Sequence, residues 1–279
     1  MNIRPRELAS YDVILVNTSA GKDSQAMLDV VMEQARAAGV ADRVVAVHCD
    51  LGRVEWPGVR ELAEEQAAHY GVRFEAVSRA QGDLLDHVLA HGRWPAPTQR
   101  YCTSDHKRGQ VFRLLTQLGV EHRRRPGPAP EGAVARRRHG RVRVLQAMGM
   151  RAEESPARAK LLPFEHDERA SNGRRHVDTW LPIHGWTVGQ VWDRIRASGV
   201  RHHYAYDLGM PRLSCVFCIY ASEDALLLAG EHNRELLAEY VRVEKAISHD
   251  FKHHLPIARI AERLERGDRT REPIRSWCM

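Results

Sequence analysis

A short apolar run followed at once by a small polar loop constrains this chain more than any other feature. The run spans residues 11–17, the loop is Ser19-Ala20-Gly21-Lys22-Asp23-Ser24, and apolar residues at helical spacing follow over 24–38. A buried parallel strand is short, β-branched and apolar, and its crossover connection is usually a helix. The sequence therefore predicts a strand, a tight turn and a helix in direct succession.

The same alternation continues along the chain. Strands are predicted over 43–48, 72–77 and 142–148, and helices over 58–70, 83–91, 107–118, 188–198 and 223–247. Strands that alternate with helices favour a parallel sheet covered on both faces. We expect an α/β fold with a doubly wound parallel sheet and a C-terminal helical region.

Length and charge suggest how the chain is divided. The 279 residues predict one α/β domain over 1–220, with a basic insert at about 121–143, and a helical tail over 221–279. Lys plus Arg number 42 against 36 Asp plus Glu, and the stretch from Arg123 to Arg143 is rich in arginine with a single glutamate. Such a stretch favours a polyanionic partner such as a nucleic acid. The alternative is a solvated surface loop.

Composition also indicates the compartment. No apolar run approaches the roughly 20 residues that a membrane-spanning helix needs, and residues 1–10 lack the apolar region of a secretory signal. We expect a cytoplasmic protein with no membrane partner. Five cysteines, an odd number, argue against a disulfide framework and favour a metal site or a reactive thiol.

The loop after the first strand has the chemistry of an anion site. Backbone N–H groups at a helix N-terminus attract a phosphate, the hydroxyls of Ser19 and Ser24 can donate to its oxygens, and Lys22 adds positive charge. Gly21 is expected to permit a tight bend close to the ligand. The alternative is an ordinary serine-capped helix start.

This loop differs from the Walker pattern, because its lysine precedes an aspartate. It resembles the SGGxDS signature of the PP-loop ATP pyrophosphatases, with Ala20 in place of the first glycine. The resemblance implies that the residues of the loop bind the phosphates of an adenine nucleotide, and that Lys22 and Asp23 take part in catalysis. A bridging Mg²⁺ is expected, since the charge of the leaving pyrophosphate must be neutralised.

Later segments make the resemblance narrower. In order, they are similar to motifs of the phosphoadenosine phosphosulfate (PAPS) reductase branch, which includes the DNA phosphorothioation protein DndC and its relatives. The segments are Cys49-Asp50-Leu51-Gly52, Tyr101-Cys102-Thr103 with Lys107, Gly149-Met150-Arg151 with Glu154, Ser155 and Arg158, Pro182–Trp186 with Val191-Trp192, Tyr206–Gly209 with Arg212, and Cys215-Val216-Phe217-Cys218.

The resemblance implies roles for three polar residues. Asp50 would lie near the nucleotide or its metal, and Arg151 and Arg158 would face the anion that is transferred. The two arginines are seven apart, so they would share one face if their segment is helical. Without the resemblance they would be surface arginines, and Trp180, Trp186 and Trp192 are assigned to packing.

The cysteines predict a metal centre. Cys215 and Cys218 form a C-x-x-C pair, and Cys102 occupies the cysteine position of the family. We prefer a [4Fe–4S] cluster on these three, with Zn²⁺, a redox dithiol or plain buried thiols as alternatives. A fourth ligand could be Cys278, a histidine or an exogenous sulfur, and Cys49 is assigned to packing.

Two departures separate the chain from assimilatory reductases. Cluster-bearing members of that group have a Cys-Cys pair where this chain has Tyr101-Cys102, and their nucleophilic Glu-Cys-Gly-Leu-His-like tail is replaced by Arg275–Met279. The first hypothesis is therefore an ATP-using sulfur transfer to a nucleic acid, as in DNA phosphorothioation. The alternatives are a thiol-dependent reductase of adenylyl or phosphoadenylyl sulfate, with Cys278 as attacking thiol, and a nucleotide-binding subunit without catalysis.

Each hypothesis carries its own partners. An adenine nucleotide, either ATP or a sulfonucleotide, is common to all three. The sulfur-transfer hypothesis adds a nucleic acid, a sulfur donor such as a cysteine desulfurase, and subunits of a modification complex.

Overall fold

One mixed sheet organises the molecule. The computed structural model describes residues 5–124, 140–270 and 274. Its six-stranded sheet has the order β3-β2-β1-β4-β6-β5, and every pair is parallel except β5 with β6. The strands are β1 (Val13–Thr18), β2 (Val44–Cys49), β3 (Arg73–Val77), β4 (Val142–Met148), β5 (Phe164–His166) and β6 (Arg175–Trp180). The predicted doubly wound α/β fold is confirmed.

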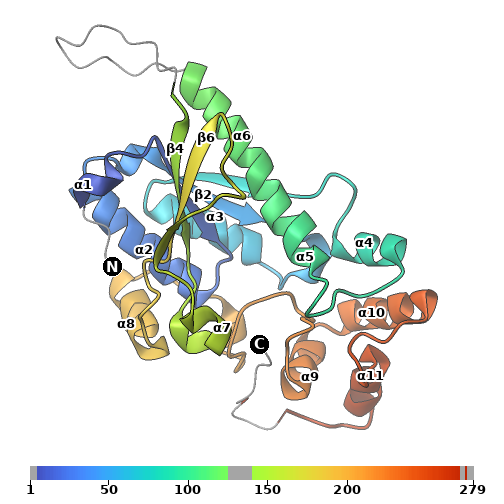
Figure 1. Ribbon diagram of the computed structural model, residues 1–279. Coiled ribbons are helices and arrows are strands. Elements are labelled where there is room, and N and C mark those ends of the chain that lie inside the picture. Colours follow the sequence, from blue (N-terminus) through green and yellow to red (C-terminus); the bar gives the residue numbers. More distant parts are fainter. Residues whose placement is uncertain (1–4, 125–139, 271–273, 275–279) are drawn as a thin grey trace, which may run out of the picture.

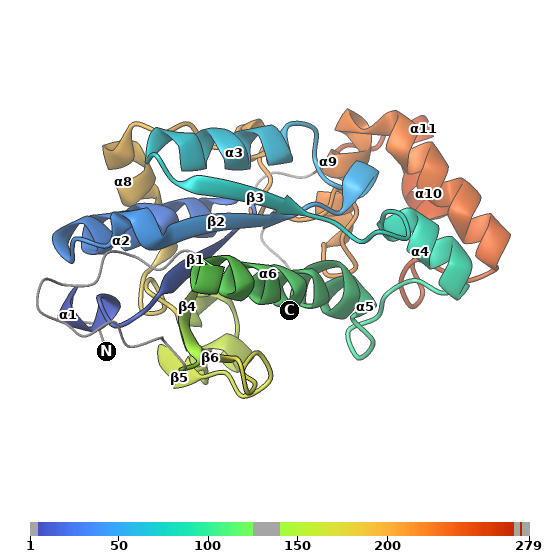
Figure 2. The same cartoon turned by 90° about the horizontal axis from the view of Figure 1, so that it is seen from above.

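Helices cover both faces of this sheet (Figure 1). On one face, residues of α2 (Lys22–Ala37) and α8 (Val188–Ser198) share a buried apolar cluster with β1, β2 and β4. On the other face, α6 (Gly109–Arg124) packs against alternate residues of the same strands. Figure 2 shows α6 and α3 (Val59–His69) on opposite sides of the strands.

The strand order creates a reversal beside β1. The chain leaves β1 towards β2 and β3 and later returns to β4 on the other side of β1. Doubly wound sheets bind ligands at the carboxyl ends of the strands where the order reverses. The loop that follows β1 lies at this point.

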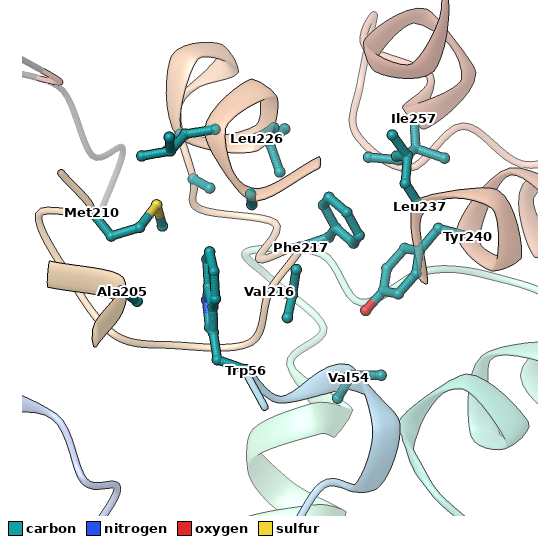
Figure 3. Packing of buried hydrophobic residues seen from close by; sticks show 14 of the residues in the cluster. Val54, Trp56, Ala205, Met210, Val216, Phe217, Leu226, Leu237, Tyr240 and Ile257 are labelled. Carbon is teal, nitrogen blue, oxygen red and sulfur yellow. The ribbon is translucent and has the colours of Figure 1, made fainter. Parts of the chain in front are cut away.

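The C-terminal helices pack onto the sheet domain. They are α9 (Glu223–His232), α10 (Arg234–Ile247) and α11 (Ile257–Glu265), and α10 also contacts α4 (Leu84–His91). Figure 3 shows Trp56 beside Val216, and Phe217 beside Leu237 and Tyr240, within one buried cluster. This cluster joins residues on both sides of position 220, and the division into a domain and a tail stays a prediction.

The prediction of one helix over 223–247 is wrong. Asn233 has φ −136° and ψ 57°, which ends α9 and begins α10. A second difference is α11, which the prediction missed. The buried carboxylate of Glu244 accepts hydrogen bonds from the backbone N–H groups of Ile257 and Ala258, at 2.7 and 3.0 Å, and so caps the N-terminus of α11.

The remaining short elements complete the description. They are α1 (Pro5–Leu8), α5 (Tyr101–Thr103), α7 (Pro156–Ala159), the 3₁₀ turns 41–43, 52–54, 152–154 and 204–206, and a π-helical turn over Ser104–Arg108. Within the described ranges, every helix is too short or too polar to cross a membrane.

Candidate functional site

The phosphate-loop candidate occupies the turn between β1 and α2. Ala20 is fully buried and adopts the left-handed φ of 55°, whereas Gly21 is extended at φ −74° and ψ 154°. The expectation that Gly21 supplies the bend is therefore wrong, because the residue with positive φ is Ala20. A Cβ at Gly21 would lie 3.3 Å from both Ser19 Oγ and Tyr206 Oη, so glycine serves close packing there.

Internal hydrogen bonds hold the loop. Ser24 Oγ accepts from the Ser19 N–H at 3.1 Å and donates to the Gly21 carbonyl at 2.9 Å. The Lys22 N–H donates to Tyr206 Oη at 2.9 Å. The Lys22 ammonium is buried, donates to the Pro211 carbonyl at 3.2 Å and lies 3.2 Å from Asp23. Ser19 faces the cleft described below.

A second chain segment is packed directly onto the start of α2. Gly149 follows β4, and a Cβ on it would lie 2.8 Å from the Asp23 carbonyl oxygen and 3.0 Å from the Ser24 nitrogen. These neighbours are backbone atoms, which cannot move aside as a flexible side chain can. Gly149 is therefore required for the close approach of β4 to the loop.

The arginines form an ion-pair network beside the loop. Arg151 is buried and its Nε lies 2.6 Å from Asp23 Oδ1, and it also pairs with Glu153. Arg158 and Arg212 both pair with Glu154, Arg212 at 3.1 Å. Burial, with the Arg212 charge adding to it, lowers the pKa of Arg158.

The segment from Arg151 to Arg158 is not one continuous helix, so the condition for a shared helical face is not met. A 3₁₀ turn over Ala152–Glu154 is followed by Ser155 in an extended conformation, at φ −171° and ψ 157°, before α7 begins. Glu154 nevertheless connects the two arginines, because its carboxylate accepts from the Arg151 N–H and pairs with Arg158. Asp50 lies apart from them, where it accepts from the Gly52 N–H at 2.8 Å and pairs with Arg60 at 3.4 Å.

Three thiols lie near Lys107, those of Cys215, Cys49 and Cys102. Loss of water around the Lys107 ammonium lowers its pKa, but the nearby Cys215, Glu55, Cys49 and Cys102 raise the pKa by more. Burial raises the pKa of Cys102 and Cys215, and that of Cys49 to about 11.

Cys218 lies within electrostatic reach of the other two predicted ligands, Cys102 and Cys215. Cys49 packs against two apolar clusters, as predicted, and in addition its Sγ lies 3.7 Å from the Lys107 carbonyl and it lines the cleft. The structure therefore brings together the three predicted ligand cysteines and adds a fourth thiol.

A π-helical turn carries Lys107. In this turn His106 is fully buried, and its Nε2 lies 3.0 Å from His87 Nδ1. Burial, and then the neighbouring His87, lowers the pKa of His106 to about 4, so it is neutral at pH 7. Single π-helical turns are rare and are often found at functional sites.

One cleft of about 1210 Å³ connects the two groups. It lies at the carboxyl ends of β1, β2 and β4, with Ser19 on one side and Lys107 and Cys49 on another. The remaining wall is formed by the segment from Glu165 to Arg169. Buried Gln146 also lines the cleft, and its Oε1 has no hydrogen-bond partner among the described residues.

Two predicted features lie outside the described residues. They are Cys278 and most of the arginine-rich stretch, residues 125–139. Two functional candidates were missed from the sequence, Tyr206 and the buried His48, whose Nε2 lies 2.9 Å from Glu55 Oε2. Tyr206 stands in the Tyr-Asp-x-Gly segment, so a signal for it was present, whereas His48 is hidden in a buried strand.

The strand order and the loop after β1 define an α/β protein of the PP-loop fold. The sequence profile of the phosphoadenosine phosphosulfate reductase domain matches residues 13–221, so the chain belongs to this family. Both the predicted superfamily and the predicted branch are confirmed.

Comparisons with individual proteins agree on the fold and differ in the share of each chain that they cover. The FMN adenylyltransferase of Candida glabrata superposes with a TM-score of 0.50 at 13% identity, covering 77% of this chain and 58% of that one. The adenosine 5'-phosphosulfate reductase of Allochromatium vinosum is 25% identical over 214 residues, which are 75% of this chain and 69% of that protein.

Two other relatives are matched over only part of their length. An uncharacterized 37.8 kDa protein of Escherichia phage 186 is 26% identical over 59% of this chain and 43% of that protein. A tRNA-cytidine(32) 2-sulfurtransferase of Sorangium cellulosum is 31% identical over 40% of this chain and 38% of that enzyme. The chain thus spans less than half of the length of these two relatives.

Proposed function

We propose that this protein is an enzyme that uses an adenine nucleotide to transfer sulfur to a nucleic acid. The observation that carries the proposal is the cleft, which is lined by Ser19 of the phosphate-loop candidate and also by Cys49 and Lys107, with Cys102 and Cys215 near that lysine. A sulfur-transfer enzyme needs both groups in reach of one acceptor atom.

The loop side would bind the nucleotide. Ser19, Gly21 and Ser24 would contact the phosphates at the N-terminus of α2, with Lys22 and a bound Mg²⁺ adding positive charge. Arg151, Arg158 and Arg212 lie beside Asp23 and Glu154, and they could exchange these partners for phosphate oxygens. The unpartnered Gln146 Oε1 suits an N–H donor, such as the amino group of a base.

The thiol side fits a [4Fe–4S] cluster better than a single ion. The ligand atoms of a single metal ion lie close together. In the described part of the chain, the sulfur atoms of Cys102, Cys215 and Cys218 do not all lie within 4.8 Å of one another. A cubane spreads its sulfur ligands farther apart, and the Lys107 ammonium would offset the negative charge of bound thiolates. When bound, the cluster would supply an open iron that holds sulfur.

The reaction would proceed in three displacements. An oxygen of the acceptor attacks the α-phosphorus of ATP and pyrophosphate leaves, with its charge neutralised by Lys22, Mg²⁺ and the loop N–H groups. The terminal sulfur of a donor persulfide, such as that of a cysteine desulfurase, then attacks the activated atom, and AMP leaves with the oxygen. A thiol attacks the resulting disulfide, which releases the sulfur on the acceptor, and the thiol becomes oxidised to a disulfide with the donor cysteine. Asp23 would orient Arg151 towards the transferred group.

The acceptor is proposed to be a nucleic acid for two reasons. The stretch from Arg123 to Arg143 is rich in arginine, and several matched relatives are named tRNA-cytidine(32) 2-sulfurtransferases. Transfer to DNA, as in phosphorothioation, is the narrower form of the proposal.

Anaerobic purification tests the proposal. We expect iron and sulfide in nearly equal amounts, and ATP converted to AMP and pyrophosphate when an acceptor is present. A colourless protein with stoichiometric zinc would replace the cluster by a zinc site. Absence of ATP cleavage with tRNA, DNA and small acceptors would contradict the transfer reaction.

Salt dependence tests the nucleic-acid partner. The logarithm of affinity should fall linearly with the logarithm of salt, by about 0.9 per neutralised phosphate of duplex DNA. Replacing Arg136, Arg137 and Arg138 by alanine should reduce this slope by up to about three, while ATP affinity stays unchanged. An unchanged slope would leave the arginine stretch as a solvated loop.

A second candidate is a reductase of adenylyl or phosphoadenylyl sulfate. The match to the Allochromatium vinosum reductase over 75% of this chain favours it. In that reaction Cys278 would attack the sulfate sulfur, the adenine nucleotide would leave, and a dithiol would reduce the product to sulfite. Release of sulfite from a sulfonucleotide with thioredoxin, but no ATP cleavage, would identify this activity.

A further inference from the structure

A histidine–carboxylate cluster lies at the edge of the sheet, apart from the thiols. His166 comes from the edge strand β5, and His176 and Asp178 come from β6. His166 stands opposite Asp178 in the antiparallel register, and His176 is two residues earlier on β6, so all three side chains share one face of the sheet. Figure 2 shows the two strands side by side.

The three side chains converge on one point. His166 Nδ1 lies 3.1 Å and His176 Nε2 lies 3.0 Å from the same Asp178 oxygen, Oδ1. The imidazole rings are nearly parallel, with centroids 4.3 Å apart and planes at 21°. Ligand atoms bound at about 2.0–2.2 Å to one zinc ion are separated from each other by roughly 3 Å, which matches this spacing.

A hydrogen bond from Tyr11 orients the carboxylate of Asp178. Asp178 is 6% exposed, and its second oxygen, Oδ2, accepts a hydrogen bond from buried Tyr11 Oη at 2.8 Å. Carboxylates that bind metal ions are usually oriented by such an outer hydrogen bond. The side chains of His166 and His176 are 40% and 34% exposed, so an ion can enter from solvent and keep a water ligand.

We propose that His166, His176 and Asp178 bind one divalent transition-metal ion, with zinc as the reference ion. Two imidazoles and one carboxylate suit zinc, cobalt or nickel, whereas calcium and magnesium prefer oxygen ligands. Three protein ligands leave the remaining position to water.

The ion would connect the edge strand to the rest of the sheet. All three residues of β5 are exposed, and the wall of the cleft from Glu165 to Arg169 begins within this strand. Joining His166 to β6 through a metal would fix this wall relative to the sheet. The site thus shares His166 with the wall of the cleft and uses none of the cysteines.

Zinc titration tests the site. The background is a variant with Cys102, Cys215 and Cys218 replaced by serine, so that zinc bound to these thiols does not contribute. We expect one zinc per chain by calorimetry, and a loss of affinity of roughly 100-fold or more in His176→Ala and in His166→Ala. Tyr11→Phe removes only the outer hydrogen bond and should cost about 10-fold.

A matched control is His202→Gln. His202 also forms a histidine–aspartate pair, with Nε2 2.8 Å from Asp207 Oδ1, but this pair lies outside the cluster, so zinc affinity should not change. Affinity that is unchanged in both cluster variants, or the absence of stoichiometric binding in the background, would overturn the proposal.

Thermal unfolding provides a second measurement. Zinc should raise the melting temperature of the background protein by a few degrees and leave that of His176→Ala unchanged, because an ion that binds only the folded state stabilises it. Circular dichroism without metal establishes that the variants fold. Cobalt should give weak visible absorption without thiolate charge-transfer bands, and an equal zinc shift in His176→Ala would contradict the site. Neither result depends on cluster assembly at the cysteines.

Discussion

The phosphate-loop candidate (the loop side) and the thiols near Lys107 (the thiol side) differ in how their polar groups are paired. On the loop side, polar groups already have partners within the protein: Ser24 bonds to Gly21, Lys22 to Pro211, and Asp23 to Arg151. On the thiol side, Cys49, Cys102 and Cys215 have raised pKa values and share one ammonium, that of Lys107. The loop is thus preorganised before a ligand binds, whereas the thiols become fully satisfied only with a ligand that accepts their electron pairs.

The largest effect is expected on the thiol side. Cys215→Ala or Cys218→Ala should abolish brown colour and sulfur transfer, because a cluster loses one of its three protein ligands. ATP affinity should stay as it is, since the loop is formed without the thiols. Anaerobic absorption near about 400 nm and ATP calorimetry on the same preparations measure both. Loss of both properties together would contradict the separation of the two sides.

Acid should lower the free energy of unfolding through His106, which lies on the thiol side. The pKa of His106 is about 4 in the folded protein, from burial, against an ordinary value near 6.5. The unfolded chain therefore binds the proton first, so stability is complete above pH 6.5 and is lost as the pH falls towards 4.

The expected loss is about 2–3 kcal/mol in the free energy of unfolding, measured by urea titration at pH 7.5 and pH 4.5. His106→Gln should show a smaller difference between the two pH values. His69→Gln, at an exposed position, is the control. An equal pH dependence in all three proteins would mean that His106 does not titrate as the structure indicates.

Gly149→Ala probes the loop side. The added methyl group would overlap the Asp23 and Ser24 backbone, and such overpacking typically costs about 1–3 kcal/mol. We expect ATP affinity to fall roughly 10- to 100-fold with the thiol chemistry retained. Gly185→Ala is the matched control, because a Cβ there meets no atom within 4 Å. Equal effects of the two substitutions would show that contact with the loop is not the cause.

Lys22→Ala and Ser24→Ala should have the smallest effects. Each removes one polar group from the phosphate site while the apolar core stays intact, so we expect about a 10-fold loss of ATP affinity. Calorimetric titration measures it. Unchanged affinity in both variants would end the assignment of this loop to phosphate.

Sequence patterns predicted the central strands and missed the edge of the sheet for a physical reason. The strands β1, β2 and β4 are buried on both faces and appear as apolar runs. In contrast, β6 carries buried Arg175 and Asp178, whose charges are satisfied by partners far away in the sequence. Arg175 donates to the Phe112 carbonyl and to Thr116, and Asp178 accepts from Tyr11. Such pairings have no periodicity, so this strand was not predicted.

The site shows the same difference between features that are local in sequence and contacts between distant residues. The phosphate-loop candidate and the C-x-x-C pair are local in sequence, and their residues were identified. Cys49 is assigned to packing in the sequence because it comes directly after a predicted buried strand. Its position near Lys107 depends on the π-helical turn over Ser104–Arg108. A break in helical geometry of this kind has no composition signature, so only the folded chain shows which thiols meet.

Tyr206 has a mechanical consequence. Its hydroxyl oxygen accepts from the Lys22 N–H at 2.9 Å and from the Leu213 N–H at 3.3 Å, and it thus joins two backbones that are far apart in sequence. Leu213 lies two residues before Cys215, while Lys22 is the first residue of α2. A phosphate that draws the Lys22 N–H towards itself must break the bond to the tyrosine or pull its ring along. In the second case the displacement reaches the C-x-x-C segment. The hydroxyl group of Tyr206 then couples the phosphate-loop candidate to the cysteines.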